Sequence, residues 1–304
     1  MVDMPPPPVP DPLISPRVVT RITDLRRAVA AARRAGRTVG LVPTMGALHE
    51  GHLSLVRESR AECDETLVSI FVNPTQFGPQ EDFAQYPRTL EADLRQLSAV
   101  GADRVYTPAR DHLYPPGFST YVQPPHVAAR WEGEHRPQHF RGVTTVVLKL
   151  FLLAQADVAY FGQKDYQQAC VIERMVEDLN VPIRIRVCPT VREPDGLALS
   201  SRNRYLNREQ RLRALGLWKS LVTAGQCVER GEQDASDIIR RMREVLAEHR
   251  VSPIDYVALV DPQTLEPVVR LDRTTMALVA AFVDQTRLID NLRLVPPGQA
   301  RRKS

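Results

Sequence analysis

Two histidines three residues apart are the first candidates for chemistry in this sequence. His49 and His52 lie in the stretch Pro43-Thr-Met-Gly-Ala-Leu-His-Glu-Gly-His52, which follows an apolar run at 39–42. They are expected on the first turn of a helix that also carries Leu53, Leu55 and Val56. This order is typical of a strand, a tight loop and a helix. Because residues i and i+3 lie on one helix face, we expect both imidazoles to point at the same spot.

The start of that helix is expected to bind an anion. Its first N–H groups lack partners within the helix and lie at the positive end of the helix dipole. Gly46 and Gly51 let a ligand approach the backbone closely. The chain has neither a G-x-x-x-x-G-K-S/T nor a G-x-G-x-x-G motif, so the predicted phosphate site depends on the helix and the histidines. The alternative is that the two histidines only cap the helix or lie on the surface.

Two amides follow the next apolar run. Residues 65–72 have the composition of a strand buried on both faces of a parallel sheet, and Asn73 and Gln76 come after it. In open α/β sheets, ligands bind at the carboxyl ends of the strands, so we expect these amides on the same rim as His49 and His52. An Asn before a proline is also a common turn residue, and that interpretation stays open.

A cation and a polar loop come later in the chain. The apolar run 157–161 is followed by Gly162-Gln-Lys-Asp165 and a helix, which repeats the order found around the histidines. A lysine is unfavourable at a helix start unless an anion is bound there. The loop 191–204 contains Leu199-Ser-Ser-Arg202, whose hydroxyl and guanidinium donors suit a polyphosphate, although such a tripeptide is also typical of a solvated loop.

Strands and helices alternate along the first two thirds of the chain. Beyond the segments above, we expect helices at about 24–35, 90–100, 143–154 and 166–179, and strands at 104–106 and 183–187. This alternation predicts an α/β fold with a Rossmann-like parallel sheet flanked by helices. The polar stretch 126–142 is predicted to be either a lid over the rim or an ordinary surface connection.

The pattern changes after residue 204. Two amphipathic helices at 208–230 and 235–249 precede apolar runs at 256–260, 276–283 and 286–294, which predicts a smaller C-terminal α+β domain. We therefore divide the chain into a disordered Pro-rich tail at 1–16, a Rossmann-like domain at 17–204, the C-terminal α+β domain at 205–295 and a basic tail at 296–304.

The composition bounds the class of protein. A chain of 304 residues with 43% hydrophobic residues can fill two cores. Its net charge of +4 is too small and too evenly spread to predict a nucleic-acid or membrane partner. Cys63, Cys170, Cys188 and Cys227 form no C-x-x-C pair, so we expect neither a zinc site nor a disulfide framework. A reducing, cytoplasmic location is the expectation.

Five motifs occur together and in order. They are Pro43-Thr-Met-Gly-Ala-Leu-His-Glu-Gly-His52, Phe71-Val-Asn-Pro-Thr-Gln-Phe-Gly78, Arg136-Pro-Gln-His-Phe-Arg-Gly-Val143, Phe161-Gly-Gln-Lys-Asp-Tyr-Gln-Gln168 and Leu199-Ser-Ser-Arg-Asn203. As a set they closely resemble the pantothenate synthetase family, whose members join pantoate to β-alanine, over about residues 17–295. That family is similar to the nucleotidylyltransferase-like α/β proteins, in which an H-x-x-H element and a second loop hold ATP.

The resemblance implies a ligation in two steps, with ATP and pantoate bound by the 17–204 domain. Pantoate attacks the α-phosphorus of ATP and expels pyrophosphate, and the amine of β-alanine then attacks the pantoyl adenylate and releases AMP. ATP would be the co-substrate, with Mg²⁺ carried mainly by its phosphate oxygens. The resemblance also implies a homodimer.

The resemblance assigns roles to residues that match the family motifs. His52, His49 and Lys164 would be catalytic, with His52 the proton donor. Asn73, Gln76 and Gln168 would bind the substrates, because neutral amides orient a hydroxy acid without competing for its charge. The implied ATP-binding residues are Met45, Gly46, Ala47, Leu48, His49, Glu50, Gly51, His52, Gly162, Gln163, Lys164, Asp165, Val191, Leu199, Ser200, Ser201 and Arg202.

The chain departs from the family pattern at three places. Gln163 stands where Glu is common, and Leu199 where Met is common; neither position needs a charged contact. Glu91-Ala-Asp93 lacks the fuller acidic run of some relatives, so no metal ligand is assigned.

Two rival functions remain open from the sequence. One is an adenylyl-transferring ligase for another hydroxy or amino acid. Gln76 and Gln168 argue against an amino acid, whose ammonium group would favour a carboxylate. The other is a non-catalytic module that senses adenylate. Simple binding would not need both histidines, Lys164 and Ser200–Arg202 together.

Overall fold

The structure is a computed structural model that describes residues 15–79 and 81–297. The predicted Pro-rich tail lies outside the described residues except for positions 15 and 16, and the predicted basic tail except for positions 296 and 297. Within the described part of the chain, no helix has both the length and the apolar composition that a membrane crossing requires.

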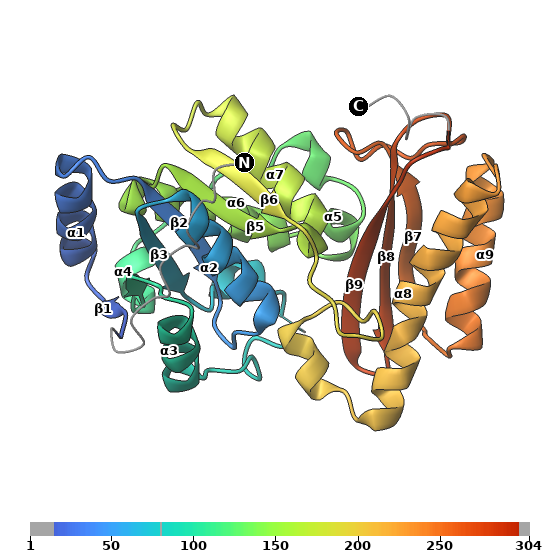
Figure 1. Cartoon of the computed structure of the whole chain (residues 1–304), viewed down its shortest axis with the longest axis horizontal. Coiled ribbons are helices and arrows are strands. Elements are labelled where there is room, and N and C mark those ends of the chain that lie inside the picture. Colours follow the sequence, from blue (N-terminus) through green and yellow to red (C-terminus); the bar gives the residue numbers. More distant parts are fainter. Residues whose placement is uncertain (1–14, 80, 298–304) are drawn as a thin grey trace, which may run out of the picture.

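A six-stranded parallel sheet organises the first two thirds of the chain (Figure 1). Its strands are β1 (Arg17–Val19), β2 (Val39–Thr44), β3 (Glu65–Ile70), β4 (Arg104–Tyr106), β5 (Val158–Gly162) and β6 (Arg184–Cys188), in the order β1-β4-β3-β2-β5-β6. The chain moves outward from β2 through β3 to β4, then crosses back to place β5 and β6 on the other side of β2. The strand order therefore reverses between β2 and β5, the place where open α/β sheets bind ligands.

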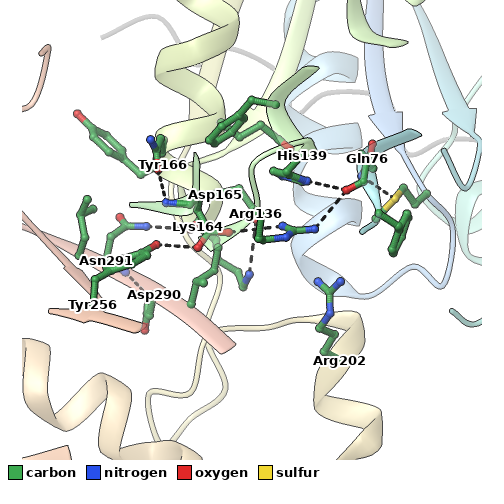
Figure 2. A pocket seen from close by; sticks show the side chains of 18 residues that line it. Gln76, Arg136, His139, Lys164, Asp165, Tyr166, Arg202, Tyr256, Asp290 and Asn291 are labelled. Atoms are coloured by element: carbon green, nitrogen blue, oxygen red, sulfur yellow. Dashed lines mark hydrogen bonds and ion pairs between the residues drawn. The ribbon is translucent and has the colours of Figure 1, made fainter. Parts of the chain in front are cut away.

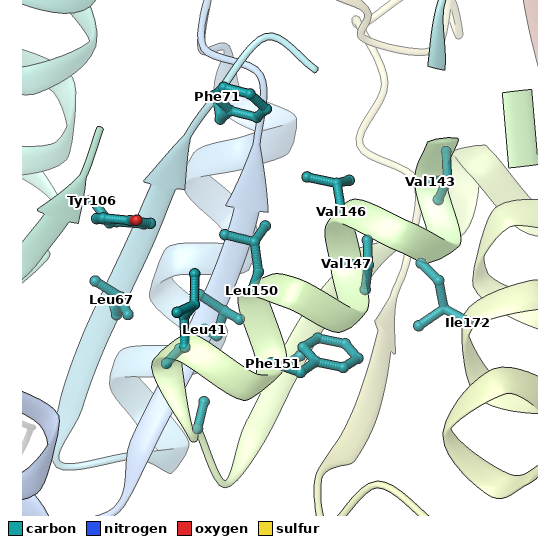
Figure 3. Close-up of a cluster of buried hydrophobic side chains, with 14 of the residues drawn as sticks. Leu41, Leu67, Phe71, Tyr106, Val143, Val146, Val147, Leu150, Phe151 and Ile172 are labelled. Atoms are coloured by element: carbon teal, nitrogen blue, oxygen red, sulfur yellow. The ribbon is translucent and has the colours of Figure 1, made fainter. Parts of the chain in front are cut away.

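Helices cover both faces of this sheet, which confirms the predicted α/β class. The helices are α1 (Ile22–Arg34), α2 (Glu50–Glu62), α3 (Leu90–Ala99), α6 (His139–Ala154) and α7 (Tyr166–Asp178). Because strand side chains alternate, Leu41 packs with α1, α6 and α7 on one face, and Val42 packs with α2 and α3 on the other. Figure 3 shows α6 placing Val147, Leu150 and Phe151 in the first of these cores.

Short elements occupy the loops. They are α4 (Arg110–Leu113), α5 (Glu132–His135), η1 (Pro74–Gln76), η2 (His126–Ala128), η3 (Gln163–Asp165) and η4 (Ser201–Tyr205). The stretch 126–142 contains η2, α5 and the start of α6, which begins at His139 and not at the predicted residue 143. His139 and Phe140 are buried and continue the apolar face of α6, which explains the earlier start.

A three-stranded antiparallel sheet forms the smaller C-terminal domain. It consists of β7 (Ile254–Val260), β8 (Thr275–Val283) and β9 (Thr286–Leu294), with α8 (Arg208–Glu229) and α9 (Ala235–Glu248) against one face (Figure 1). Val257 and Val279 point to these helices, whereas Ala258 and Leu278 point to the other face, which packs against Trp131 and other residues of the first domain. The predicted boundary at 204 and 205 falls within η4, and as a division of the chain it stays a prediction.

Candidate active site

A cavity of about 210 Å³ opens at the carboxyl ends of β2 and β5, where the strand order reverses. The structure brings most of the predicted site residues to its wall. They are Met45, His49, Gly51, His52, Asn73, Gln76, Gly162, Lys164, Asp165, Gln168, Val191, Leu199, Ser200, Ser201 and Arg202. Segments far apart in the sequence thus meet around one space.

His49 and His52 form a reciprocal cap at the start of α2. Nδ1 of His49 accepts a hydrogen bond from the N–H of Gly51 at 3.2 Å, and Nδ1 of His52 accepts one from the N–H of His49 at 3.4 Å. Because both Nδ1 atoms accept, the neutral rings carry their hydrogen on Nε2. The ring centroids lie 4.1 Å apart. Each imidazole can therefore donate a hydrogen bond into the cavity.

These bonds narrow the prediction that free amides at the helix start bind the anion. The imidazoles already bind the N–H groups of the N-cap His49 and of Gly51, the second residue of α2. A ligand would instead meet the Nε2–H groups, which stand between the positive helix end and the cavity. The capping interpretation is confirmed, and the two histidines also line the cavity. That they bind a phosphate stays a prediction.

Asp93 of α3 binds the main chain of the loop between β2 and α2. Its carboxylate, only 1% exposed, accepts hydrogen bonds from the N–H groups of Ala47 at 3.0 Å and Leu48 at 2.9 Å. Gly46 donates instead to the Thr44 hydroxyl at 3.2 Å. Gly46, Ala47 and Leu48, predicted to bind ATP, therefore turn their amides away and do not line the cavity.

Burial keeps both histidines neutral. Burial, followed by the charges of His52 and Lys164, lowers the pKa of His49 to about 3. Burial, followed by the charges of Lys164 and Arg204, lowers the pKa of His52 to about 4. At pH 7 the two rings are hydrogen-bond donors without net charge. A bound anion would raise both pKa values, because it favours the charged imidazolium.

Lys164 reaches the cavity from the second loop-to-helix junction, between β5 and α7. It belongs to η3, and its Nζ lies 3.9 Å from the Oδ1 of Asp165. Its charge contributes to the low pKa values of His49 and His52, so the ammonium group and the two imidazoles share one region of the cavity.

The Ser-Ser-Arg loop closes a third side of the cavity. The Ser201 hydroxyl donates to the Ala47 carbonyl at 3.0 Å, which ties this loop to the histidine junction. The Ser200 hydroxyl accepts from the N–H of Arg202 at 3.3 Å and caps η4. Asp82 binds the guanidinium of Arg202 at 2.9 and 3.1 Å. Arg202 thus lines the cavity as a fixed cation.

The predicted amides lie at the other end of the cavity. Asn73 is 1% exposed, and its Nδ2 donates to Oε1 of Gln76 at 3.1 Å and to the Gly142 carbonyl at 3.2 Å. Nε2 of Gln76 lies 3.0 Å from the Met45 sulfur. Gln168 faces the same space from α7. Asn73 therefore orients Gln76, while Gln76 and Gln168 present amides to a ligand.

Comparison with known proteins decides the family. The family model described as pantoate-beta-alanine ligase matches residues 17–293. Pantothenate synthetase from Moorella thermoacetica is 53% identical over 273 residues, which cover 90% of this chain and 96% of that protein. The chain belongs to the pantoate-beta-alanine ligase family.

Solved structures of pantoate-beta-alanine ligases share the fold. A crystal structure of pantothenate synthetase from Thermus thermophilus matches with a TM-score of 0.88 and 44% identity, covering 92% of this chain and 100% of that chain. The ligase from Francisella tularensis, crystallised with beta-gamma ATP and beta-alanine, matches with a TM-score of 0.76 and 31% identity, covering 91% and 97%. The resemblance inferred from the five motifs is confirmed.

Sequence reasoning missed the groups that hold the main chain of Gln76 in this ligase. Nδ1 of His139 donates to the Gln76 carbonyl at 3.0 Å, and Nη2 of Arg136 donates to it at 3.4 Å (Figure 2). Arg136 is itself bound by Glu81 at 2.6 Å. Both residues lie in the third quoted motif, but nothing in the local pattern indicates a contact with Gln76.

An ion-pair network fixes the stretch 126–142 beside the site. Burial alone would raise the pKa of Glu132, but the hydrogen bonds and charge of Arg287 outweigh it and lower the pKa to about 2. Arg287, on β9, also binds Asp255, and the Tyr256 hydroxyl donates to Glu132 at 2.9 Å. The stretch is thus an ordered connection bound to the C-terminal domain.

Other parts of the cavity wall also escaped prediction. Val143, Val147 and Leu150 of α6 form an apolar side, and the Thr190 hydroxyl is buried there without a hydrogen-bond partner among the described residues. The signal for the apolar side was the nearly continuous apolar sequence of α6, which has more buried positions than one face of a helix requires.

Two predicted ATP-binding side chains turn away from the cavity. Glu50 pairs with Arg57 on the surface of α2. Nε2 of Gln163 donates to Oδ1 of Asn291 at 3.3 Å. Where many family members have Glu, this chain therefore has an amide, Gln163, that hydrogen-bonds the amide of Asn291. Leu199 does line the cavity, and its N–H bonds the Val191 carbonyl at 3.0 Å.

Proposed function

We propose that this ligase joins pantoate to β-alanine through a pantoyl adenylate, with ATP as co-substrate. The observation that carries the proposal is one cavity in which Lys164 and the Nε2 groups of His49 and His52 lie beside the amides of Gln76 and Gln168. Cationic and N–H donors suit a triphosphate, and neutral amides suit a hydroxy acid. The relatives named above support the same reaction.

In the first step, a carboxylate oxygen of pantoate attacks the α-phosphorus of ATP. The new P–O bond replaces the bond to the bridging oxygen, and pyrophosphate leaves with that electron pair. Lys164, His49 and His52 meet the charge that grows on the phosphate oxygens. His52, neutral in the free enzyme, acts first as an Nε2–H donor, and the leaving group raises its proton affinity.

In the second step, the amine of β-alanine attacks the acyl carbon of the adenylate. The C–N bond forms, the bond from the acyl carbon to the adenylate oxygen breaks, AMP leaves and the amine loses a proton. Gln76 and Gln168 keep the pantoyl group in place between the steps, and Gln76 also meets β-alanine. Asn73 and the carbonyl contacts from His139 hold Gln76 for both reactions.

Mg²⁺ is proposed to enter with ATP. The described residues contain no group of three or more His, Cys, Asp or Glu side chains arranged to hold a metal ion. The Asp93 carboxylate is engaged by the amides of Ala47 and Leu48. Phosphate oxygens and water would therefore supply most of the ligands, as is usual for this ion.

The test is incubation with ATP, pantoate and β-alanine while AMP, pyrophosphate and pantothenate are quantified. We expect the three products in equal amounts, and none of them without pantoate. Formation of ADP and phosphate would contradict an adenylate. Replacing pantoate by other hydroxy or amino acids addresses the rival ligase, and equal turnover with any of them would overturn the proposed substrate. ATP binding without turnover would favour the sensor.

We further propose a homodimer that acts in the cytoplasm. Both points rest on the family, and the four cysteines, all described and all free thiols, suit a reducing compartment. Light scattering after gel filtration should give twice the chain mass of 34.2 kDa. A mass of one chain would contradict the dimer.

A further inference from the structure

Asn291 of strand β9 binds the main chain on which Lys164 is mounted. Its side chain reaches across from the C-terminal domain, where Figure 2 shows it beside Lys164. Nδ2 donates to the carbonyls of Gln163 and Lys164, each at 2.9 Å. Its Oδ1 accepts from Nε2 of Gln163 at 3.3 Å. Asn291 is 2% exposed. Both donor hydrogens of one buried amide are thus directed at two consecutive residues of the site.

The strand that carries Asn291 is itself fixed. Asn291 pairs with Leu278 in the antiparallel ladder of β8 and β9. The neighbouring Asp290, 5% exposed, binds Arg192 at 2.6 and 2.9 Å, and Arg192 also donates to the Asn291 carbonyl at 3.3 Å. Asn291 is therefore a rigid support and not a surface side chain that adapts to its surroundings.

The segment that Asn291 binds is short. The helix η3 has three residues, and neither its own N-cap, Gly162, nor the N-cap of α7, Asp165, makes a side-chain capping bond. The orientation of Lys164 depends on this turn. At the other junction, His49 and His52 accept hydrogen bonds from the N–H groups at the start of their own helix. At η3 the described hydrogen bonds from outside the turn go to its carbonyls, and Asn291 donates them.

We propose that Asn291 is a positioning residue for Lys164, holding the 163–164 main chain so that the ammonium group faces the phosphates. The proposal rests on the proposed function, because it assigns Asn291 a part in the adenylation step. Asn291 acts through Lys164 and does not touch the substrates. A displacement of Lys164 by about 1 Å is enough to slow the step strongly.

The experiment is a double-mutant cycle on pantoate-dependent exchange of labelled pyrophosphate into ATP without β-alanine, which reports the adenylation step alone. We expect Asn291→Ala to lower kcat about tenfold and to leave KM for pantoate within about twofold. In enzyme that already carries Lys164→Ala, the same substitution should lower kcat by less than about twofold, because its target is gone.

Two further variants separate positioning from general instability. Asn207→Ala removes the N-cap of α8, whose Oδ1 accepts from the Gln210 N–H at 2.9 Å, and should lower the Tm of the enzyme without changing kcat. Asn291→Thr keeps a residue that favours strands but cannot reach the two carbonyls, so it serves if Asn291→Ala does not fold.

The outcomes are distinct. Equal fold losses from Asn291→Ala in the wild-type and Lys164→Ala backgrounds would overturn the positioning role, as would an Asn207→Ala enzyme that loses kcat in proportion to its Tm. Wild-type kcat in a folded Asn291→Thr enzyme would overturn it too. Absence of exchange in the wild-type enzyme would instead overturn the proposed function, so the two failures can be told apart.

Discussion

The two loop-to-helix junctions of the site have the same order of elements but different supports. The junction between β2 and α2 is held by groups of its own domain. Asp93 binds the main chain of the loop, and His49 and His52 cap the helix. The junction between β5 and α7 is held from outside, by Asn291 of the C-terminal sheet. One half of the site is thus preorganised locally, and the other depends on contact between the domains.

If Lys164 binds the phosphates as proposed, this difference gives the C-terminal domain an indirect part in the adenylation step. Its β9 strand contacts three segments of the first domain, through Arg287 to Glu132, Asp290 to Arg192, and Asn291 to the 163–164 turn. Disturbing these contacts should affect the Lys164 side of the cavity more than the histidine side. Single substitutions can remove one support at a time.

The largest effects are expected where a donor to the phosphates is removed. His52→Ala and Lys164→Ala should each lower kcat by at least about 10²-fold, because each loses a group that meets developing charge. Steady-state kinetics with all three substrates provide the measurement, with circular dichroism to check the fold. Near-normal turnover in either folded variant would refute the role of its side chain and show that its junction does not contribute to the chemistry.

The next effect concerns the contact between the domains. Arg192→Ala should lower the free energy of unfolding by about 3 kcal/mol, because it leaves the buried Asp290 carboxylate without its cation. Arg240→Ala is the matched control, since its pairs with Asp237 and Glu244 are more than half exposed and should contribute little to stability. Equal losses in urea titrations of the two variants would show that the buried pair of Arg192 and Asp290 stabilises the fold no more than an exposed pair does.

A somewhat smaller loss is expected at the locally held junction. Asp93→Ala leaves the buried N–H groups of Ala47 and Leu48 without acceptors, and should lower the free energy of unfolding by about 2 kcal/mol. Glu91→Ala, on the exposed side of the same helix, is the control and should change stability little. If Asp93→Ala unfolds at the same urea concentration as Glu91→Ala, the carboxylate is not the support of this loop.

The smallest effect is a dependence of stability on pH. The folded pKa of His52, about 4, lies below the ordinary histidine value of 6.5, so the unfolded chain binds more protons between these values. The stabilisation from the neutral ring is complete above about pH 6.5 and is lost as the pH falls toward 4. The free energy of unfolding should be lower at pH 5 than at pH 7.5. His52→Asn should make this difference smaller, by up to about 2 kcal/mol. An unchanged pH dependence would mean that His52 is not buried as a neutral ring.

The sequence predicted the parts of the site that local patterns encode. Apolar runs end at Asn73 and Gly162, and the carboxyl ends of parallel strands share one rim, so the meeting of these segments followed from the fold class. The apolar run predicted at 286–294 has the same bounds as β9.

The supports of the site could not be predicted, because each joins residues that only tertiary packing brings together. Asp93 follows Leu48 by 45 positions, and Asn291 follows Gln163 by 128. No periodicity links such pairs. The sequence predicted that the two histidines lie on the first turn of α2, but not that their rings would bind the N–H groups of His49 and Gly51. Caps and buried ion pairs depend on side-chain geometry that composition does not encode.

The proposed activity requires that the two junctions and the serine-arginine loop together hold a triphosphate. Calorimetric titration of the full-length enzyme with ATP and with AMP, both in the presence of Mg²⁺, measures whether they do. We expect ATP to bind at least about tenfold more tightly than AMP, because only ATP offers its β- and γ-phosphates to Lys164 and the two imidazoles. Equal affinities for the two nucleotides, or no binding of ATP, would contradict this arrangement.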